Sequence, residues 1–340
     1  MLLSVLDQST IVTGRSADQS IRESMALAQA CEAWGYHRYW VAEHHNSQSQ
    51  AGTAPEILMA ALAATTSRIR IGSAGVMLPH YAALKVAEQF RVLEAIAPGR
   101  IDMGLGRAPG SDGLTAHALN PNANQAADLF PAQVRDLLAW VSGSELVERH
   151  PFRSVVAQPV GPSSPEPWIL GSSDYGAQVA AHFGLPYCFA HFITDGSGCA
   201  EAIDTYCTLY KPSARFPEPI PAITVWAMAA ETAEEAERHF LPRAIWRLGR
   251  DRGVYAPLPS AEEAARATLS EMDRARLEQI RARAIYGTPD VVARKLRSLA
   301  QECGVGEIAM LTTLHDPEAR RRSYQLIAEE FSLTTNRKAA

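Results

Sequence analysis

The strongest candidates for chemistry lie at the end of segment 36–46, which reads YHRYWVAEHHN. Aromatic and β-branched residues fill its first half, as is typical of a buried strand. Glu43, His44 and His45 follow, and such ionisable side chains are costly beside an apolar strand unless a site or solvent takes them up. Adjacent residues of an extended segment point to opposite sides, so at most one histidine should face a pocket. We predict that His44 is a general acid or base or a hydrogen-bond partner; the alternative is a capped strand end with satisfied imidazoles, which fits His45 better.

A metal centre is not expected at these histidines, because no carboxylate stands near them at ligand spacing. The chain has five cysteines, an odd number without CxxC spacing, so neither a zinc site nor a disulfide framework is indicated. They are Cys31, Cys188, Cys199, Cys207 and Cys303.

A second candidate is the glycine-rich stretch 104–110, GLGRAPG, in which Arg107 stands alone between glycines. A guanidinium there could form a two-pronged contact with an anion that approaches the bare backbone. The glycine spacing is not that of the GxGxxG dinucleotide fingerprint, and the stretch comes too late in the chain to open a βαβ unit. A turn with a surface arginine is the alternative.

Support for an anion site comes from residues 171–181, GSSDYGAQVAA, where Gly171, Ser172 and Ser173 precede a predicted helix. The free amides and the positive dipole end of a helix start bind anions, and serine hydroxyls add donors. One arginine and one helix start together suit a phosphomonoester. Serine is also a common helix cap, so an ordinary cap is the alternative for this stretch.

Three further positions are weaker candidates. Residues 73–79, SAGVMLP, are small where a flat ligand would need room, although core packing explains them equally well. Asp7 follows the first predicted strand and His191 follows the sixth, and for His191 a polar loop residue is the alternative.

All of these candidates come together if the chain folds as a barrel. Strand and helix patterns alternate along the sequence, and such short repeats force parallel neighbours and right-handed crossovers. We therefore predict an α/β fold, a single (β/α)8 TIM barrel over residues 1–340, with its active residues at the carboxyl ends of the strands. The strands are expected at 2–6, 36–42, 69–75, 100–107, 168–171, 185–189, 222–229 and 307–312, and the helices at 17–34, 55–66, 81–97, 125–141, 174–183, 199–209, 289–303 and 316–331.

A longer helical segment, residues 232–285, lies between predicted strands seven and eight. It is rich in arginine and alanine and is interrupted by GVYAPLP at 253–259. Its polar excess and its prolines predict a mobile insertion near the barrel mouth, which could act as a lid. Residues 143–167, rich in proline and serine, are expected to form a long connection over the outside of the barrel.

The bulk composition narrows the possible functions. With 340 residues, 47% hydrophobic and 20% charged, the chain can bury a large core. Its net charge is -5 and it has no long Lys/Arg cluster, which argues against nucleic acid as a partner. The amino terminus lacks a signal-peptide pattern and no stretch approaches the roughly 20 apolar residues of a membrane span. No membrane contact is expected, and the predicted location is cytoplasmic.

At these residues the chain resembles the bacterial luciferase-like, flavin-dependent monooxygenase family. A subgroup of that family carries AEHHN, GVMLP, GRIDxGLGRAPG, GSS, GTPxxVAxKL and HDxExRxRSY. The matching stretches here are VAEHHN, GVMLP, GRIDMGLGRAPG, GSS, GTPDVVARKL and HDPEARRRSY, and the likeness runs from the first strand to the last helix. The resemblance implies a (β/α)8 barrel, usually a homodimer, that binds reduced FMN at the carboxyl strand ends.

The resemblance also implies roles for individual residues. It places His44 near the reactive edge of the flavin and makes Arg107 the phosphate-binding arginine. It places Ser172, Ser173 and the Gly176 amide around the same phosphate.

In the resemblance, Ala74 and Gly75 fall where the family often has a cis peptide under the flavin ring. His191 is predicted as a further cofactor contact from its place after the sixth strand. Gly106 stands where light-emitting luciferases carry a cysteine, so light emission and long-chain aldehyde specificity are not expected.

The resulting hypothesis is an FMN-dependent monooxygenase that uses reduced FMN and O2 to oxygenate a small organic substrate. A separate NAD(P)H-dependent flavin reductase would supply reduced FMN, because no second nucleotide-binding unit is visible. A deazaflavin-dependent dehydrogenase and a non-catalytic flavin-binding protein are the alternatives. The loops carry no charge pattern that picks out one substrate. Alanines 60, 61, 63 and 64 give the predicted helix 55–66 a smooth face, either for a homodimer or for packing on its own barrel.

Overall fold

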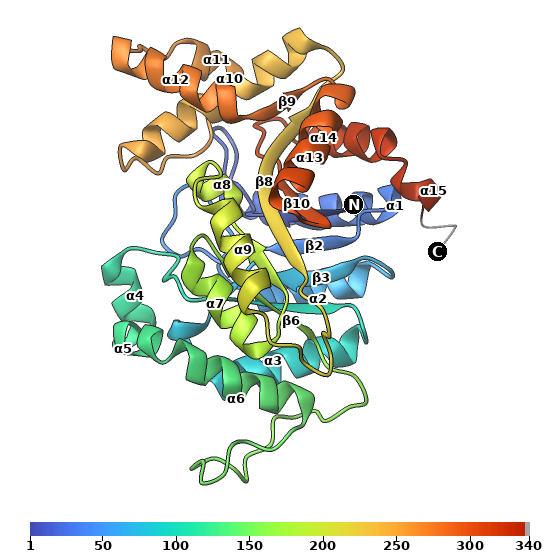
Figure 1. Ribbon diagram of the computed structural model, residues 1–340. Coiled ribbons are helices and arrows are strands. Elements are labelled where there is room, and N and C mark those ends of the chain that lie inside the picture. Colours follow the sequence, from blue (N-terminus) through green and yellow to red (C-terminus); the bar gives the residue numbers. More distant parts are fainter. Residues whose placement is uncertain (337–340) are drawn as a thin grey trace.

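Eight parallel strands close into a barrel in the computed structural model, which describes residues 1–336. The strands follow the order β1-β2-β3-β5-β6-β7-β8-β10, and β10 pairs with both β8 and β1, which closes the sheet (Figure 1). The prediction of a (β/α)8 barrel is therefore confirmed, with all eight strands where the sequence places them. They are β1 (Leu2–Asp7), β2 (Arg38–Val41), β3 (Arg70–Ser73), β5 (Ile101–Gly106), β6 (Glu166–Gly171), β7 (Tyr187–Phe189), β8 (Pro221–Ala229) and β10 (Glu307–Leu311).

Helices between the strands cover the outside of the barrel (Figure 1). The first of them ends where predicted, because Gly35 adopts a left-handed conformation (φ 90°). A side chain at Gly35 would also come within 2.9 Å of the Leu333 backbone. The covering helices are α1 (Ala17–Trp34), α2 (Pro55–Thr65), α3 (Ala83–Ile96), α6 (Phe130–Ser142), α7 (Asp174–Phe183), α9 (Cys199–Leu209), α13 (Pro289–Cys303) and α14 (Pro317–Glu330), and shorter ones are η1 (Leu78–His80), α4 (Gly113–Leu119), α5 (Ala123–Asp128), α8 (His191–Thr194) and α15 (Leu333–Asn336).

The prediction of one long helix over 125–141 is wrong. The structure has two helices there, α5 and α6, which meet at Leu129. Pro131 lies in the first turn of α6, where its missing N–H costs nothing, but it could not continue α5. Two short strands, β4 (Val76–Met77) and β9 (Ile285–Gly287), were also not predicted; they pair with β5 and β8.

The side chains of each strand alternate between two hydrophobic layers. Tyr39 and Val41 of β2 pack outward against the helices. Trp40 points into the barrel, where its ring centroid lies 5.2 Å from that of Trp168 on β6. Because β2 and β6 are not neighbours in the sheet, this contact crosses the interior. The barrel is thus a packed core rather than an open pore.

A layer of charged side chains closes the amino-terminal end of the barrel. Arg38, at the start of β2, is buried and forms ion pairs with Asp102 (2.9 Å), Glu166 (2.8 Å) and Glu307 (3.0 Å). Burial alone would lower the pKa of Arg38, but the three carboxylates outweigh it and raise the pKa. The Asp102 carboxylate also accepts from the Arg70 Nε at 2.8 Å. These side chains fill this end of the barrel.

The predicted helical insertion lies between β8 and β10 and stands above the barrel in Figure 1. It consists of α10 (Ala233–Asp251), α11 (Ala261–Ala265) and α12 (Glu271–Arg283). Ser260 and Ser270 begin the last two helices with capping boxes. Its mobility as a lid stays a prediction.

The connection from α6 to β6 runs over the far end of the molecule as a loop (Figure 1). Arg91 of α3 fixes it, since its guanidinium donates to the carbonyl oxygens of Pro159 (2.8 Å), Gly161 (3.2 Å) and Ser163 (2.6 Å).

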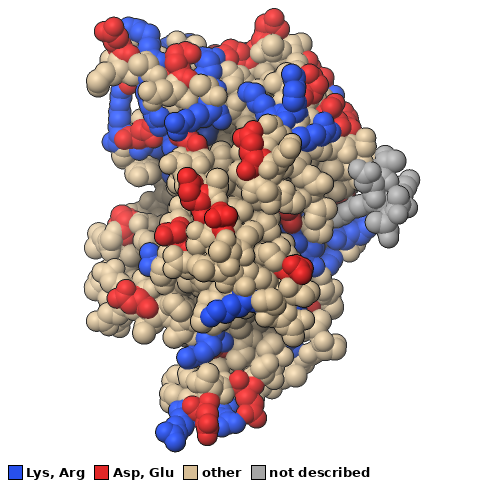
Figure 2. All heavy atoms as spheres, in the orientation of Figure 1, with Lys and Arg blue, Asp and Glu red and all other residues tan. Residues whose placement is uncertain are grey.

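Figure 2 shows basic and acidic side chains interspersed over the insertion, with a hollow at the left edge between it and the body below. Within residues 1–336, no helix is both long and apolar enough to cross a membrane.

Candidate active site

A pocket of about 380 Å³ opens at the carboxyl-terminal ends of the barrel strands. Its wall is built from segments far apart in the sequence, and it brings together seven of the predicted site residues. These are His44, Ala74, Gly75, Arg107, Ser172, Ser173 and Gly176.

The two adjacent histidines have different surroundings, as predicted for an extended segment. The His45 Nε2 lies 2.8 Å from the Oε1 of Glu43, which is fully buried. Glu43 also accepts from the Tyr81 hydroxyl (2.6 Å) and the Met77 amide (3.0 Å). The Glu43 carboxylate and His45 therefore tie the end of β2 to the next loop. Only His44 lines the pocket.

The imidazole of His44 is held neutral. Its Nδ1 is buried and has no hydrogen-bond partner within residues 1–336. The pKa of His44 is lowered to about 4. Burial is the main cause, the positive charge of Arg250 acts in the same direction, and Glu43 opposes both. A neutral imidazole with an unused nitrogen can accept a proton or a hydrogen bond from a bound ligand.

We expect His44 to titrate near pH 4 in the unliganded protein. The pKa is lower in the folded state than the value of 6.5 for a free side chain, so the folded protein binds fewer protons between those pH values. The stability that neutral His44 contributes is therefore complete above about pH 6.5 and is lost as the pH falls toward 4. NMR titration of the imidazole resonance that disappears in His44→Asn measures this directly. A midpoint near 6.5 would contradict the assigned environment.

Arg107 stands beside the start of α7. Its guanidinium carbon lies 4.0 Å from the ring centroid of Tyr175, the second residue of that helix. The Arg107 side chain is exposed, and the hydroxyl of the cap residue Ser173 makes no hydrogen bond to the helix amides. A guanidinium, serine hydroxyls and free helix amides thus meet at one end of the pocket, where an anion can bind.

The floor of the pocket includes the peptide between Ala74 and Gly75, which is cis, as the resemblance implies. A side chain at Gly75 would come within 2.9 Å of the Gly104 carbonyl oxygen. A glycine is therefore required here for the packing of the backbone as well as for room above it.

Two candidates have other surroundings. His191 lines a separate, much smaller pocket, whereas its neighbours Ala190 and Phe192 line the large one. Asp7 is fully buried and pairs with Arg320 at 2.7 Å, while the Tyr39 hydroxyl donates to it at 2.6 Å. Asp7 is thus part of the packing between the barrel and its outer helices.

Among the pocket residues that sequence reasoning missed, Tyr175 and Arg250 have the most distinctive chemistry. Arg250 reaches the pocket from α10 of the insertion, more than 200 positions from His44 in the chain. Its signal is the spacing of Arg243, Arg247 and Arg250, which lie on one side of a helix.

No group of three or more His, Cys, Asp or Glu side chains that could hold a metal ion occurs within residues 1–336.

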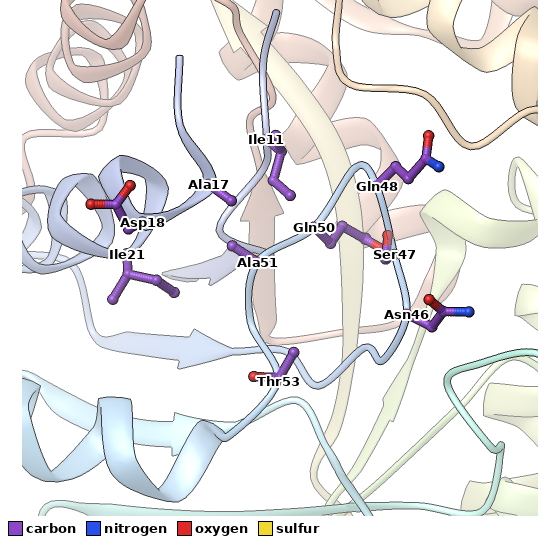
Figure 3. A pocket seen from close by; sticks show the side chains of 10 residues that line it. All are labelled: Ile11, Ala17, Asp18, Ile21, Asn46, Ser47, Gln48, Gln50, Ala51 and Thr53. Carbon is purple, nitrogen blue, oxygen red and sulfur yellow. The ribbon is translucent and has the colours of Figure 1, made fainter. Parts of the chain in front are cut away.

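A second, open groove of about 380 Å³ runs between the start of α1 and residues 46–53. Asp18 and Gln48 lie on opposite sides of this groove (Figure 3). Asp18, its only ionisable residue, is exposed and paired with Arg22, so the groove lacks a chemical centre.

Comparison with known proteins agrees with this geometry. The family model described as luciferase-like monooxygenase matches residues 1–307. The chain is 37% identical to a luciferase-like monooxygenase of Escherichia coli (strain K12) over 326 residues, 95% of each chain. It is 34% identical to the N-acetyl-S-alkylcysteine monooxygenase of Bacillus subtilis (strain 168) over 327 residues, 96% of this chain and 97% of that one.

Among solved structures, apo-MsnO8 superposes with a TM-score of 0.87 at 35% identity and covers 98% of both chains. The predicted class of enzyme, an oxidoreductase of the monooxygenase type, is confirmed by these relatives. The chain belongs to the luciferase-like monooxygenase family.

Proposed function

We propose that this protein is a flavin-dependent monooxygenase that uses reduced FMN and O2 to oxygenate a small organic substrate. The observation that carries the proposal is the pocket itself. Its wall joins an anion site around Arg107 to the neutral imidazole of His44.

The phosphate of FMN would bind at the Arg107 end. The face of Tyr175 supports the guanidinium, and Ser172 and Ser173 offer hydroxyl donors beside the amides that begin α7. Gly176 leaves little room for a larger residue, since a side chain there would come within 3.3 Å of the Tyr187 ring. A glycine therefore lets the start of α7 pack closely against β7.

The flavin ring would lie against Ala74 and Gly75, with apolar side chains such as Leu170 and Phe192 shielding it from water. Bound reduced FMN supplies the electrons and the reaction with O2. The chain's own contribution is to bind, to orient and to exclude water. His44, neutral at physiological pH, would accept a proton or a hydrogen bond through Nδ1.

Reduced FMN would come from a separate NAD(P)H-dependent flavin reductase, because the only glycine-rich loop in this pocket, at 104–110, lacks the dinucleotide spacing.

A homodimer is part of the proposal. The outer face of α2 carries Ile57, which is 69% exposed, and the exposed Ala64, while Ala63 packs on the protein's own core. An exposed apolar face suits packing against a second copy.

The named substrate of the Bacillus subtilis relative suggests where to begin with substrates. We propose a thioether panel, made of N-acetyl-S-alkylcysteines with alkyl groups of different length, as the first compounds to assay.

The Arg107→Ala variant tests the proposed function through binding. We expect it to weaken FMN binding about tenfold, because a charge-assisted hydrogen bond to a partly solvated phosphate is lost. Riboflavin lacks the phosphate, so its affinity should stay the same. Fluorescence titration of both flavins measures the two affinities, and Arg68→Ala, which removes an exposed arginine elsewhere, is the matched control.

Two results would contradict the proposal. One is an equal loss of affinity for riboflavin and FMN in Arg107→Ala. The other is tight, saturable binding of a deazaflavin by the wild type with no binding of FMN, which would favour the dehydrogenase alternative.

A further inference from the structure

A second pocket, of about 200 Å³, adjoins the proposed flavin pocket on the side of the insertion. The two pockets share four wall residues: Gln8, Phe192, Ile193 and Arg250. A molecule in the second pocket would therefore adjoin the larger pocket, whose wall includes His44.

Three arginines of α10 line this second pocket. Arg243, Arg247 and Arg250 are four and three positions apart, so their side chains lie on the same side of the helix. Three positive charges beside a small pocket need negative partners.

Arg247 has such partners within the protein. It pairs with Asp195 at 3.3 Å and with Asp251 at 3.0 Å. Arg276 pairs with the same two carboxylates, at 3.7 and 2.8 Å. Two guanidinium groups and two carboxylates thus form a balanced network.

Arg243 lacks a comparable partner. Only 8% of it is exposed, and its guanidinium carbon lies 4.3 Å from the ring centroid of Trp226. Within residues 1–336 its side chain makes no hydrogen bond or ion pair. Burial lowers the pKa of Arg243 to about 10, and the charge of Arg247 adds to the effect against Asp195 and Asp251. Arg243 nevertheless stays protonated at neutral pH.

Arg250 is also without a counter-ion. Its guanidinium carbon lies 4.7 Å from the ring of Trp246 and 5.1 Å from that of Tyr255. Its Nη1 is buried and has no hydrogen-bond partner in the part of the chain that the structure describes. The two aromatic rings hold the guanidinium at the boundary between the two pockets.

We propose that Arg243 and Arg250 bind the carboxylate of an organic acid substrate, whose remaining atoms extend into the flavin pocket. The inference rests on the proposed function, since it names the substrate class of that site. A guanidinium offers paired N–H donors that match a carboxylate, and an anion here would balance two charges that the protein leaves unpaired. The indole and phenol rings of the wall suit the apolar part of such an acid.

Hexanoate and hexanamide make a suitable probe pair, because they share shape and differ in charge. We expect wild-type protein to bind hexanoate about tenfold more tightly than hexanamide in isothermal titration calorimetry. Arg243→Gln and Arg250→Gln should each remove this preference and leave hexanamide binding unchanged. The matched control is Arg266→Gln, which removes an exposed arginine of the same insertion and should bind hexanoate like the wild type.

Equal affinity for the two probes in the wild type, or an unchanged preference for hexanoate in both variants, would overturn the proposal. So would a loss of FMN affinity with unchanged riboflavin affinity in Arg250→Gln, because the arginines would then hold the flavin phosphate. If Arg243→Gln does not fold by circular dichroism, the half-buried position Arg250 decides the question alone. Titrations on flavin-free and FMN-loaded protein distinguish the two proposals. If the protein binds hexanoate but not FMN, the proposed function is wrong and the carboxylate-binding pocket is still supported.

Discussion

The His44→Asn variant is expected to bind FMN as tightly as the wild type and to turn over about 10²- to 10⁴-fold more slowly, the usual contribution of a general acid or base. His44 lines the pocket but is not one of the residues proposed to bind the phosphate, so flavin affinity should not depend on it. Its lowered pKa keeps the imidazole neutral at physiological pH, and its unpartnered Nδ1 is free to take part in a hydrogen bond or a proton transfer during the reaction. Asparagine keeps a polar side chain of similar reach but cannot take up a proton.

The turnover rate is measured as product formation in the presence of FMN, NAD(P)H, a flavin reductase and a thioether from the panel that the wild-type enzyme converts. His117→Asn, at an exposed position of α4, is the control and should behave like the wild type. Full activity in His44→Asn would show that His44 has no catalytic role. A parallel loss of FMN affinity would make it a binding residue instead.

The Asp102→Ala variant is expected to lose about 3–5 kcal/mol of unfolding free energy, as is typical when one partner of a buried ion pair is removed. Asp102 is fully buried at the closed end of the barrel. Its carboxylate pairs with Arg38 and Arg70 and accepts from the Trp40 indole at 2.9 Å. Alanine would leave both guanidinium groups with fewer partners and the indole N–H with none.

Urea denaturation followed by circular dichroism measures this difference. Asp204→Ala removes an exposed carboxylate from α9 and is the matched control, with an expected change within about 0.5 kcal/mol. A loss below about 1 kcal/mol in Asp102→Ala would show that water or neighbouring carboxylates take over its contacts. Because Asp102 lies at the end opposite the pocket, the folded variant should still bind FMN.

Much of the fold could be predicted from local patterns. Apolar segments bounded by turn residues marked all eight barrel strands, and Gly35 marked the end of α1 because only glycine adopts its backbone conformation easily. The two short strands β4 and β9 escaped prediction, since two or three residues carry no period. The division between α5 and α6 was missed because Pro131 can begin a helix or interrupt one.

The site was predictable only in part, for a physical reason. His44 and Arg107 stand in unusual local sequence, so their residue types drew attention before any fold was known. The contact between Arg107 and Tyr175 joins two βα units and depends on the closure of the barrel. Arg250 belongs to an insertion whose direction over the barrel mouth no local pattern fixes. The charged layer around Arg38 could not be predicted from local sequence, because its members stand singly at the starts of different strands and meet only when the barrel closes.

A crystal structure of the protein with FMN would show directly how the cofactor binds. We expect the FMN phosphate within hydrogen-bonding distance of the Arg107 guanidinium and of the Ser172 or Ser173 hydroxyl, with the flavin ring against Ala74 and Gly75. A phosphate bound instead by Arg250, with Arg107 making no contact to the flavin, would contradict this expectation.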